Sequence, residues 1–221
     1  MADPRSVAAP RLSRVAGLHL AVIAMIALSW SGYLVMTWFY GYRHLMLTAA
    51  GAAHGVRGRW EVAVNLTCTV ILLAAGLLFL VWLWKSRRNA ELLCTAPHRR
   101  RRGWIIGSWF CPIVNLWFPY QVVSDVWKAS DPRTSPYSRD LSAVPGSWLV
   151  RMWWILLFAA AVAEDRADRF AHGQITIDGV RRWANWSILA TLVWLGASVM
   201  IILIVRRITA WQSTPRPVRG R

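Results

Sequence analysis

Residues 62–84 read VAVNLTCTVILLAAGLLFLVWLW, twenty-three consecutive residues without an aspartate, glutamate, lysine or arginine. A helix needs about 20 apolar residues to cross the hydrocarbon core of a bilayer. Further uncharged stretches of similar length lie between Arg14 and Arg43, within 103–124, and between Arg182 and Arg206. Four such stretches in 221 residues leave little sequence for a water-soluble core. The sequence therefore predicts an all-α integral membrane protein.

The segment 103–129 differs from the other apolar stretches because it contains Pro112 and Pro119. A proline inside a helix removes a backbone donor and clashes with the carbonyl four residues earlier. We expect two helical pieces, about 104–111 and 119–129, with a break between them. Broken backbone at membrane depth needs protein or water to satisfy its polar groups. The segment therefore either spans as a kinked helix or enters and returns on one side.

The distribution of lysine and arginine favours the second alternative. If the broken segment does not cross, the loops and termini on one side hold 18 basic residues and those on the other side hold 7. If it crosses, the two sides hold 14 and 11. Short cytoplasmic loops are enriched in positive charge. We therefore expect four spanning helices, a re-entrant or interfacial broken segment on the cytoplasmic side, and both termini in the cytoplasm.

The bias toward arginine, alanine, tryptophan and valine suggests a GC-rich genome, so we expect the plasma membrane of a bacterium. The expected parts are a cytoplasmic tail at 1–14, spans at about 15–40, 62–84, 148–163 and 183–205, the broken segment at 103–129, and a disordered basic tail at 209–221.

The net charge of +16 raises the question of nucleic-acid binding. The arginines, however, lie at the ends of apolar stretches, where lipid headgroups are found. We therefore expect anionic headgroups as partners and no nucleic acid. The densest run is Arg99, Arg100, Arg101 and Arg102. We expect it to fix the topology and contact headgroups, with an acidic protein partner as the alternative.

The broken segment carries the pattern Trp-Phe-x-Pro-x-x-Asn-x-x-x-Pro-Tyr from Trp109 to Tyr120, followed by Asp125-Val126-Trp127 and, later, by Trp153-Trp154. Over about 62–205, the chain resembles an actinobacterial membrane-protein family catalogued as domain of unknown function 4328. The resemblance implies a multi-pass bacterial membrane protein without an assigned activity, and it supplies no catalytic residue.

The broken segment is the best candidate for a functional polar site in the membrane. Broken membrane helices point their ends at ions or substrates in many transporters. Asn115 lies midway between Pro112 and Pro119, and Gln121 and Asp125 follow within two turns. The alternative is that Asn115 satisfies only the backbone groups that the prolines free.

Arg151 is the one charge set well into a predicted span, where a charge costs about 2.5–3.5 kcal/mol on insertion scales. It either extends its side chain to the headgroups or pairs with Asp125. Beyond this span, the carboxylates of Glu164, Asp165 and Asp168 alternate with arginines. A divalent cation is one interpretation, and an ion pair of Asp165 with Arg169 is the one we favour.

No nucleophile–base set, phosphate-binding loop or dinucleotide glycine pattern occurs in the sequence. We expect no enzymatic activity, no cofactor and no metal. The favoured function is a non-enzymatic scaffold or partner-binding subunit, with a second copy or another membrane protein as partner. The alternative is a small oligomeric transporter or channel built around Asn115.

Overall fold

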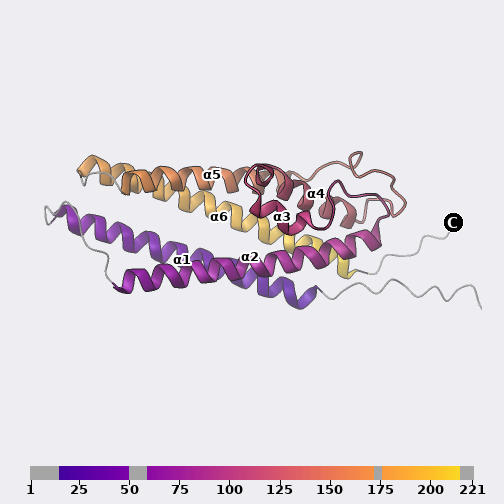
Figure 1. Ribbon diagram of the computed structural model, residues 1–221, viewed down its shortest axis with the longest axis horizontal. Helices are drawn as coiled ribbons and strands as arrows, with labels where there is room; N and C mark the ends of the chain where they lie inside the picture. The colour runs from indigo at the N-terminus through magenta and orange to yellow at the C-terminus, as the bar shows by residue number, and fades with distance from the viewer. Residues whose placement is uncertain (1–14, 50–58, 172–175, 215–221) are drawn as a thin grey trace, which may run out of the picture. The chain divides into compact units, whose positions relative to one another are not determined.

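The computed structural model describes residues 15–49, 59–171 and 176–214, and every regular element in these residues is a helix. The predicted N-terminal tail at 1–14 lies outside the described residues, as does the end of the C-terminal tail. Figure 1 shows the elements in chain order: α1 (Ala16–Ala49), α2 (Arg59–Leu93), α3 (Trp104–Phe110), the 3₁₀ helix η1 (Val114–Leu116), α4 (Phe118–Ser130), α5 (Trp148–Ala171) and α6 (Ile177–Ser213).

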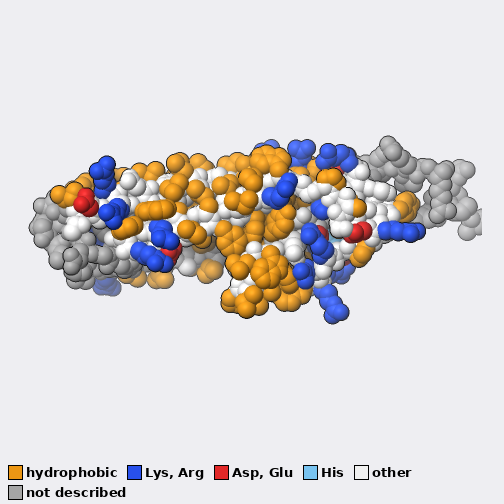
Figure 2. Space-filling model, turned by 90° about the horizontal axis from the view of Figure 1, so that it is seen from above, with side chains coloured by type: hydrophobic (Ala, Val, Ile, Leu, Met, Phe, Trp, Pro, Cys, Tyr) orange, Lys and Arg blue, Asp and Glu red, His pale blue; other side chains and the backbone are white. Residues whose placement is uncertain are grey.

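Three helices are long and apolar enough to cross a membrane: Gly17–Arg43 in α1, Val62–Leu93 in α2, and Ile177–Ser213, which is the whole of α6. Many of their large aliphatic side chains stay exposed, among them Leu73 and Leu77. Figure 2 shows hydrophobic side chains covering broad areas of the surface. Exposed apolar surface of this extent suits contact with lipid rather than with water.

The predicted fourth span, 148–163, is part of the helix α5 but is not among these three candidates. The reason lies in its charges. Arg151 stands in its first turn, and carboxylates begin at Glu164, so that no uncharged stretch of α5 matches those of the other helices. By composition alone, α5 is therefore not identified as a spanning helix.

The helix α6 extends further than the sequence predicts. The tail was expected to be disordered from residue 209, but α6 continues to Ser213, and Thr209 and Gln212 are buried. The start of the predicted disordered tail is therefore wrong. The polar contacts of these two side chains, described below, explain why helix continues here.

The chain divides into two compact units. The bundle unit comprises residues 20–79 and 148–205, which hold most of α1, most of α2, α5 and most of α6. In this unit α1 contacts α2 where Gly32 faces the Cys68 sulfur, and α6 contacts α5 where Gly196 faces Leu156. At both places a Cβ atom would come within 3.4 Å of the neighbouring side chain, so glycine permits the close approach of the helices.

The second unit, here called the basic unit, includes residues 15–19, 80–147 and 206–214 of the described chain. It holds the segment that the prolines were expected to break. The expected pieces, 104–111 and 119–129, correspond to α3 and α4, and η1 lies between them. Pro119 stands in the first turn of α4, where the missing N–H costs no helical hydrogen bond. The predicted break is confirmed.

Candidate functional site

The buried carboxylate of Asp125 organises the basic unit. Its side chain is fully buried in α4. Arg99 binds it three times: the backbone N–H donates to Oδ2 at 2.9 Å, Nε donates to Oδ1 at 2.8 Å, and Nη2 lies 2.7 Å from Oδ1. Burying a charge is costly unless it is paired and hydrogen-bonded. Arg99 meets both conditions, and its own side chain stays 40% exposed.

This contact gives Asp125 a partner other than Arg151, whose pairing with Asp125 was one of the two alternatives from the sequence. Both oxygens of the carboxylate are occupied by Arg99. The side chain of Arg151 is exposed on α5. The physical reason is that Arg99 lies in a loop, so its main chain and its side chain can converge on one carboxylate. A residue fixed in another helix offers only its side chain.

Gln121, one turn before Asp125 on α4, binds the next arginine of the run. The Nε of Arg100 donates to the side-chain oxygen of Gln121 at 2.8 Å. The guanidinium of Arg100 also lies 3.7 Å from the ring centroid of Phe118, within the range of a cation–π interaction. The predicted polar residues of α4 and the predicted basic run are therefore one site.

The C-terminal part of α2 completes this site through Arg87 and Glu91. Arg87 donates from Nε to Glu91 at 2.8 Å and from Nη2 to the carbonyl oxygen of Arg100 at 2.9 Å. Arg102 pairs with the other oxygen of Glu91, its Nε at 2.8 Å. We call the resulting set of side chains the arginine cluster; it consists of Arg87, Glu91, His98, Arg99, Arg100, Arg102, Gln121 and Asp125.

His98 is the member of the arginine cluster that sequence reasoning did not single out. Both of its ring nitrogens are buried without a hydrogen-bond partner in the described residues, as is Nη1 of Arg87. Burial, reinforced by the positive charge of Arg87, lowers the pKa of His98 to about 4. The imidazole is therefore neutral at neutral pH. A neutral ring avoids placing a further positive charge among four guanidinium groups.

Asn115 does not join this cluster. It lies in η1, where its backbone N–H donates to the carbonyl of Cys111 at 2.9 Å and so continues the turn past Pro112. No hydrogen bond of the Asn115 side chain occurs within the described ranges. The structure thus places Pro112, Asn115 and Pro119 at a backbone break, and Gln121 and Asp125 in a separate ion network.

A second polar group, which the sequence did not predict, joins α6 to α2 and α4 in the basic unit. The amide nitrogen of Gln212 donates to the carbonyl of Ser86 at 2.9 Å and to the hydroxyl of Ser130 at 2.8 Å. Its oxygen accepts from Asn89 at 3.1 Å. Gln212 was missed because it was assigned to a disordered tail. The available signal was its spacing from Val205 and Ile208, which places all three on one face of a helix.

The acidic residues at the end of α5 have different partners. Arg169 donates from Nε to Asp165 at 2.9 Å, four residues apart, as predicted. Glu164 instead accepts a hydrogen bond from the Trp194 indole of α6 at 3.2 Å. In the described residues, no group of three or more His, Cys, Asp or Glu side chains is placed to hold a metal ion.

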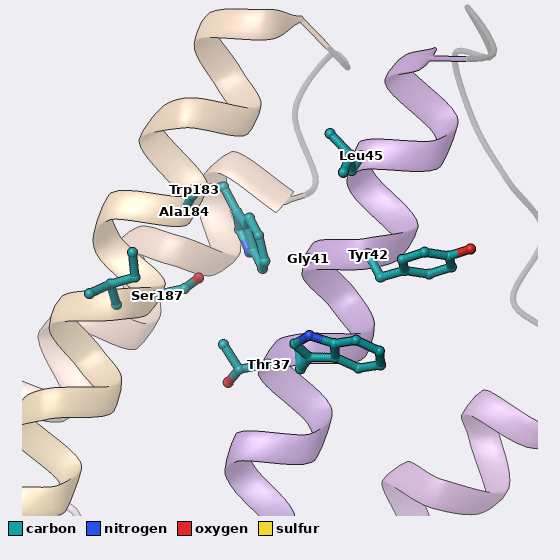
Figure 3. A pocket seen from close by; sticks show the side chains of 9 residues that line it. Thr37, Gly41, Tyr42, Leu45, Trp183, Ala184 and Ser187 are labelled. Atoms are coloured by element: carbon teal, nitrogen blue, oxygen red, sulfur yellow. The ribbon is translucent and has the colours of Figure 1, made fainter.

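A groove of about 350 Å³ lies between α1 and α6 in the bundle unit. Figure 3 shows the Trp183 ring between the two helices, while the Tyr42 ring points away from α6. The hydroxyls of Thr37 and Ser187 supply polar groups to a mainly apolar lining. The groove contains no titratable side chain other than Tyr42, so its surroundings do not suggest acid–base chemistry.

Comparison with known proteins gives one family. The model of a family described as Domain of unknown function (DUF4328) matches residues 60–210. The match includes every residue of the arginine cluster and leaves out α1. No curated protein and no solved structure matches the chain.

Proposed function

Because the chain belongs to the family of domain of unknown function 4328, which carries no assigned activity, we propose its role from its own side chains: a non-enzymatic membrane scaffold or partner-binding subunit. The observation that carries the proposal is the arginine cluster. Asp125, Glu91 and Gln121 are each bound by an arginine. A catalytic acid or base must be able to exchange its proton with a substrate. Side chains held in this way build a rigid framework instead.

The proposed topology has four spanning helices, with both termini in the cytoplasm of a bacterial cell. The packing of α5 supports it, because α5 lies in one compact unit with most of each of the three candidate spans. Phe79 of α2 contacts Trp153 with ring centroids 6.4 Å apart, and Trp194 of α6 binds Glu164. The apolar residues Ile155 and Val162 are exposed on α5, as expected for a side that meets lipid.

The segment 103–129 is proposed not to cross. The helix α3 has 7 residues and α4 has 13, which correspond to lengths of about 10 Å and 20 Å. Neither reaches across a hydrocarbon core of about 30 Å. In addition, α4 is almost completely buried by protein. The basic residues around the segment then gather on the cytoplasmic side.

A transporter or channel remains the second candidate, and the backbone break at η1 is the observation that favours it. Half-helices at membrane depth can bind ions at such breaks. Against it, the neighbouring carboxylate Asp125 is already paired with Arg99.

Two measurements on the full-length protein separate these functions. The scaffold proposal predicts that a defined membrane protein copurifies in fixed stoichiometry after cross-linking in native membranes. It also predicts that proteoliposomes carrying the purified protein conduct no tested cation, anion or neutral solute above the rate of empty vesicles. A solute flux that is lost in Asn115→Leu but kept in the matched variant Ile113→Leu would contradict the scaffold proposal and establish the alternative.

A further inference from the structure

The helix α3 and the residues around η1 expose an unusual amount of apolar surface. Five large side chains are exposed within twelve residues, two of them by more than 70%: Phe110 at 74% and Ile113 at 71%. We call this surface the apolar wedge; it consists of Ile106, Phe110, Ile113, Leu116 and Trp117. Soluble surfaces rarely collect so many large apolar side chains in one place.

The side of α3 that faces away from the wedge is packed against the basic unit. On this side, Ile105 and Ser108 are buried. Trp104 packs edge-on against Phe118 with ring centroids 4.8 Å apart, and Arg100 covers the Phe118 ring. The helix α3 therefore has one side packed on the basic unit and one side that exposes Ile106 and Phe110.

The sequence around the wedge carries charges of one sign. No aspartate or glutamate occurs between Glu91 and Asp125, whereas four consecutive arginines immediately precede α3. Three of these arginines make side-chain contacts inside the arginine cluster. Arg101 is exposed, and no side-chain contact of Arg101 is found in the part of the chain that the structure describes. An exposed guanidinium at the start of α3, where the Trp104 N–H donates to the Arg101 carbonyl, followed by an apolar surface matches the order of phosphate and acyl chain in a phospholipid.

We infer that the apolar wedge inserts shallowly into one leaflet of the bilayer and that Arg101 there binds the phosphate of an anionic phospholipid. The candidate span Val62–Leu93 contributes residues to the same compact unit, so the wedge belongs to a membrane-associated part of the chain. The seven residues of α3 limit its depth to about 10 Å, the depth of an interfacial element. Of the four arginines that the sequence offered as headgroup contacts, the inference selects Arg101.

The test places a fluorescent label on the wedge in full-length protein reconstituted into nanodiscs. Cysteines replace Phe110 or Ile113 in a background in which Cys68, Cys94 and Cys111 are alanine. The quenchers are lipids with a nitroxide near the headgroup or deep in the acyl chain, and aqueous iodide. Labels on the wedge should be quenched most by the shallow nitroxide and little by iodide. A label at Tyr137, which is 78% exposed in a loop of the same unit, should show the reverse.

The lipid charge is tested in the same samples by carrying the shallow nitroxide on phosphatidylglycerol or on phosphatidylcholine. Quenching at position 110 should favour phosphatidylglycerol by about two- to fivefold, as expected for one arginine near the surface. Arg101→Gln should bring this ratio close to one, and the control Arg139→Gln in the loop should leave it unchanged.

Three results would overturn the inference. Strong iodide quenching would place the wedge in water. Protection from both lipid and iodide would mean that protein covers it, either a partner or a second copy. Stronger quenching by the deep nitroxide would mean that the segment penetrates the bilayer. Solute flux and copurification are measured in separate experiments, so failure of this inference and failure of the scaffold proposal are distinguishable.

Discussion

Replacing Arg99 by alanine should lower the free energy of unfolding by about 3–5 kcal/mol, the cost of leaving a buried charge without its partner. Asp125 is fully buried, and Arg99 supplies both of its side-chain donors. In the variant, only the backbone N–H of residue 99 remains to bind the carboxylate. The measurement is unfolding of the purified protein in mixed micelles by titration with dodecyl sulfate.

The matched control is Arg101→Ala, which removes the same charge two residues away from an exposed position. It should change the free energy of unfolding by no more than about 0.5 kcal/mol. Double-mutant cycles then identify the partner of Asp125. Arg99 and Asp125 should be strongly coupled, and Arg151 and Asp125 should be additive. Coupling of Asp125 to Arg151 in place of Arg99 would show that the ion network has been misassigned.

The second large effect is a loss of stability in mild acid that depends on His98. Its pKa in the folded protein is about 4, below the ordinary histidine value of 6.5. Between these values the unfolded chain binds a proton that the folded protein does not. The contribution of His98 to the free energy of unfolding should therefore be fully present above pH 6.5. It should be lost as the pH drops, by about 3 kcal/mol in total once the pH is below 4.

The same titration on His98→Gln separates this effect from the titration of carboxylates. The charged groups around the imidazole are Arg87 and Arg102, which disfavour its protonation, and Asp125 and Glu91, which favour it. Without the histidine, the slope of stability between pH 6.5 and 4.5 should flatten. An unchanged slope in His98→Gln would mean that the imidazole is not held neutral in the folded protein.

The membrane helices were largely predictable because their signal is local. Uncharged stretches of more than 20 residues identified α1, α2 and α6, and two prolines located the break between α3 and α4. Composition does not identify α5 as a span, because Arg151 and Glu164 bound a shorter apolar stretch. The extension of α6 to Ser213 was missed because its support comes from α2 and α4, far away in the sequence.

The site was predicted as parts and not as a whole. Gln121, Asp125 and the run from Arg99 to Arg102 were each identified from the sequence, yet the contacts between them span more than 20 residues. One signal was available: Asp125 is the first acidic residue after the arginine run, so it is the nearest following carboxylate that can neutralise it. The neutral state of His98 could not be foreseen, because it depends on burial.

The central claim is that the chain crosses the membrane four times, so that the loop after α4 and the loop before α6 face opposite sides. Single cysteines at Ser135 and Ile177 test it in the background without native cysteines. Both positions are exposed. With a membrane-impermeant maleimide, the account predicts labelling of position 177 in intact cells and of position 135 only after permeabilisation. Labelling of both positions under the same condition would contradict four crossings.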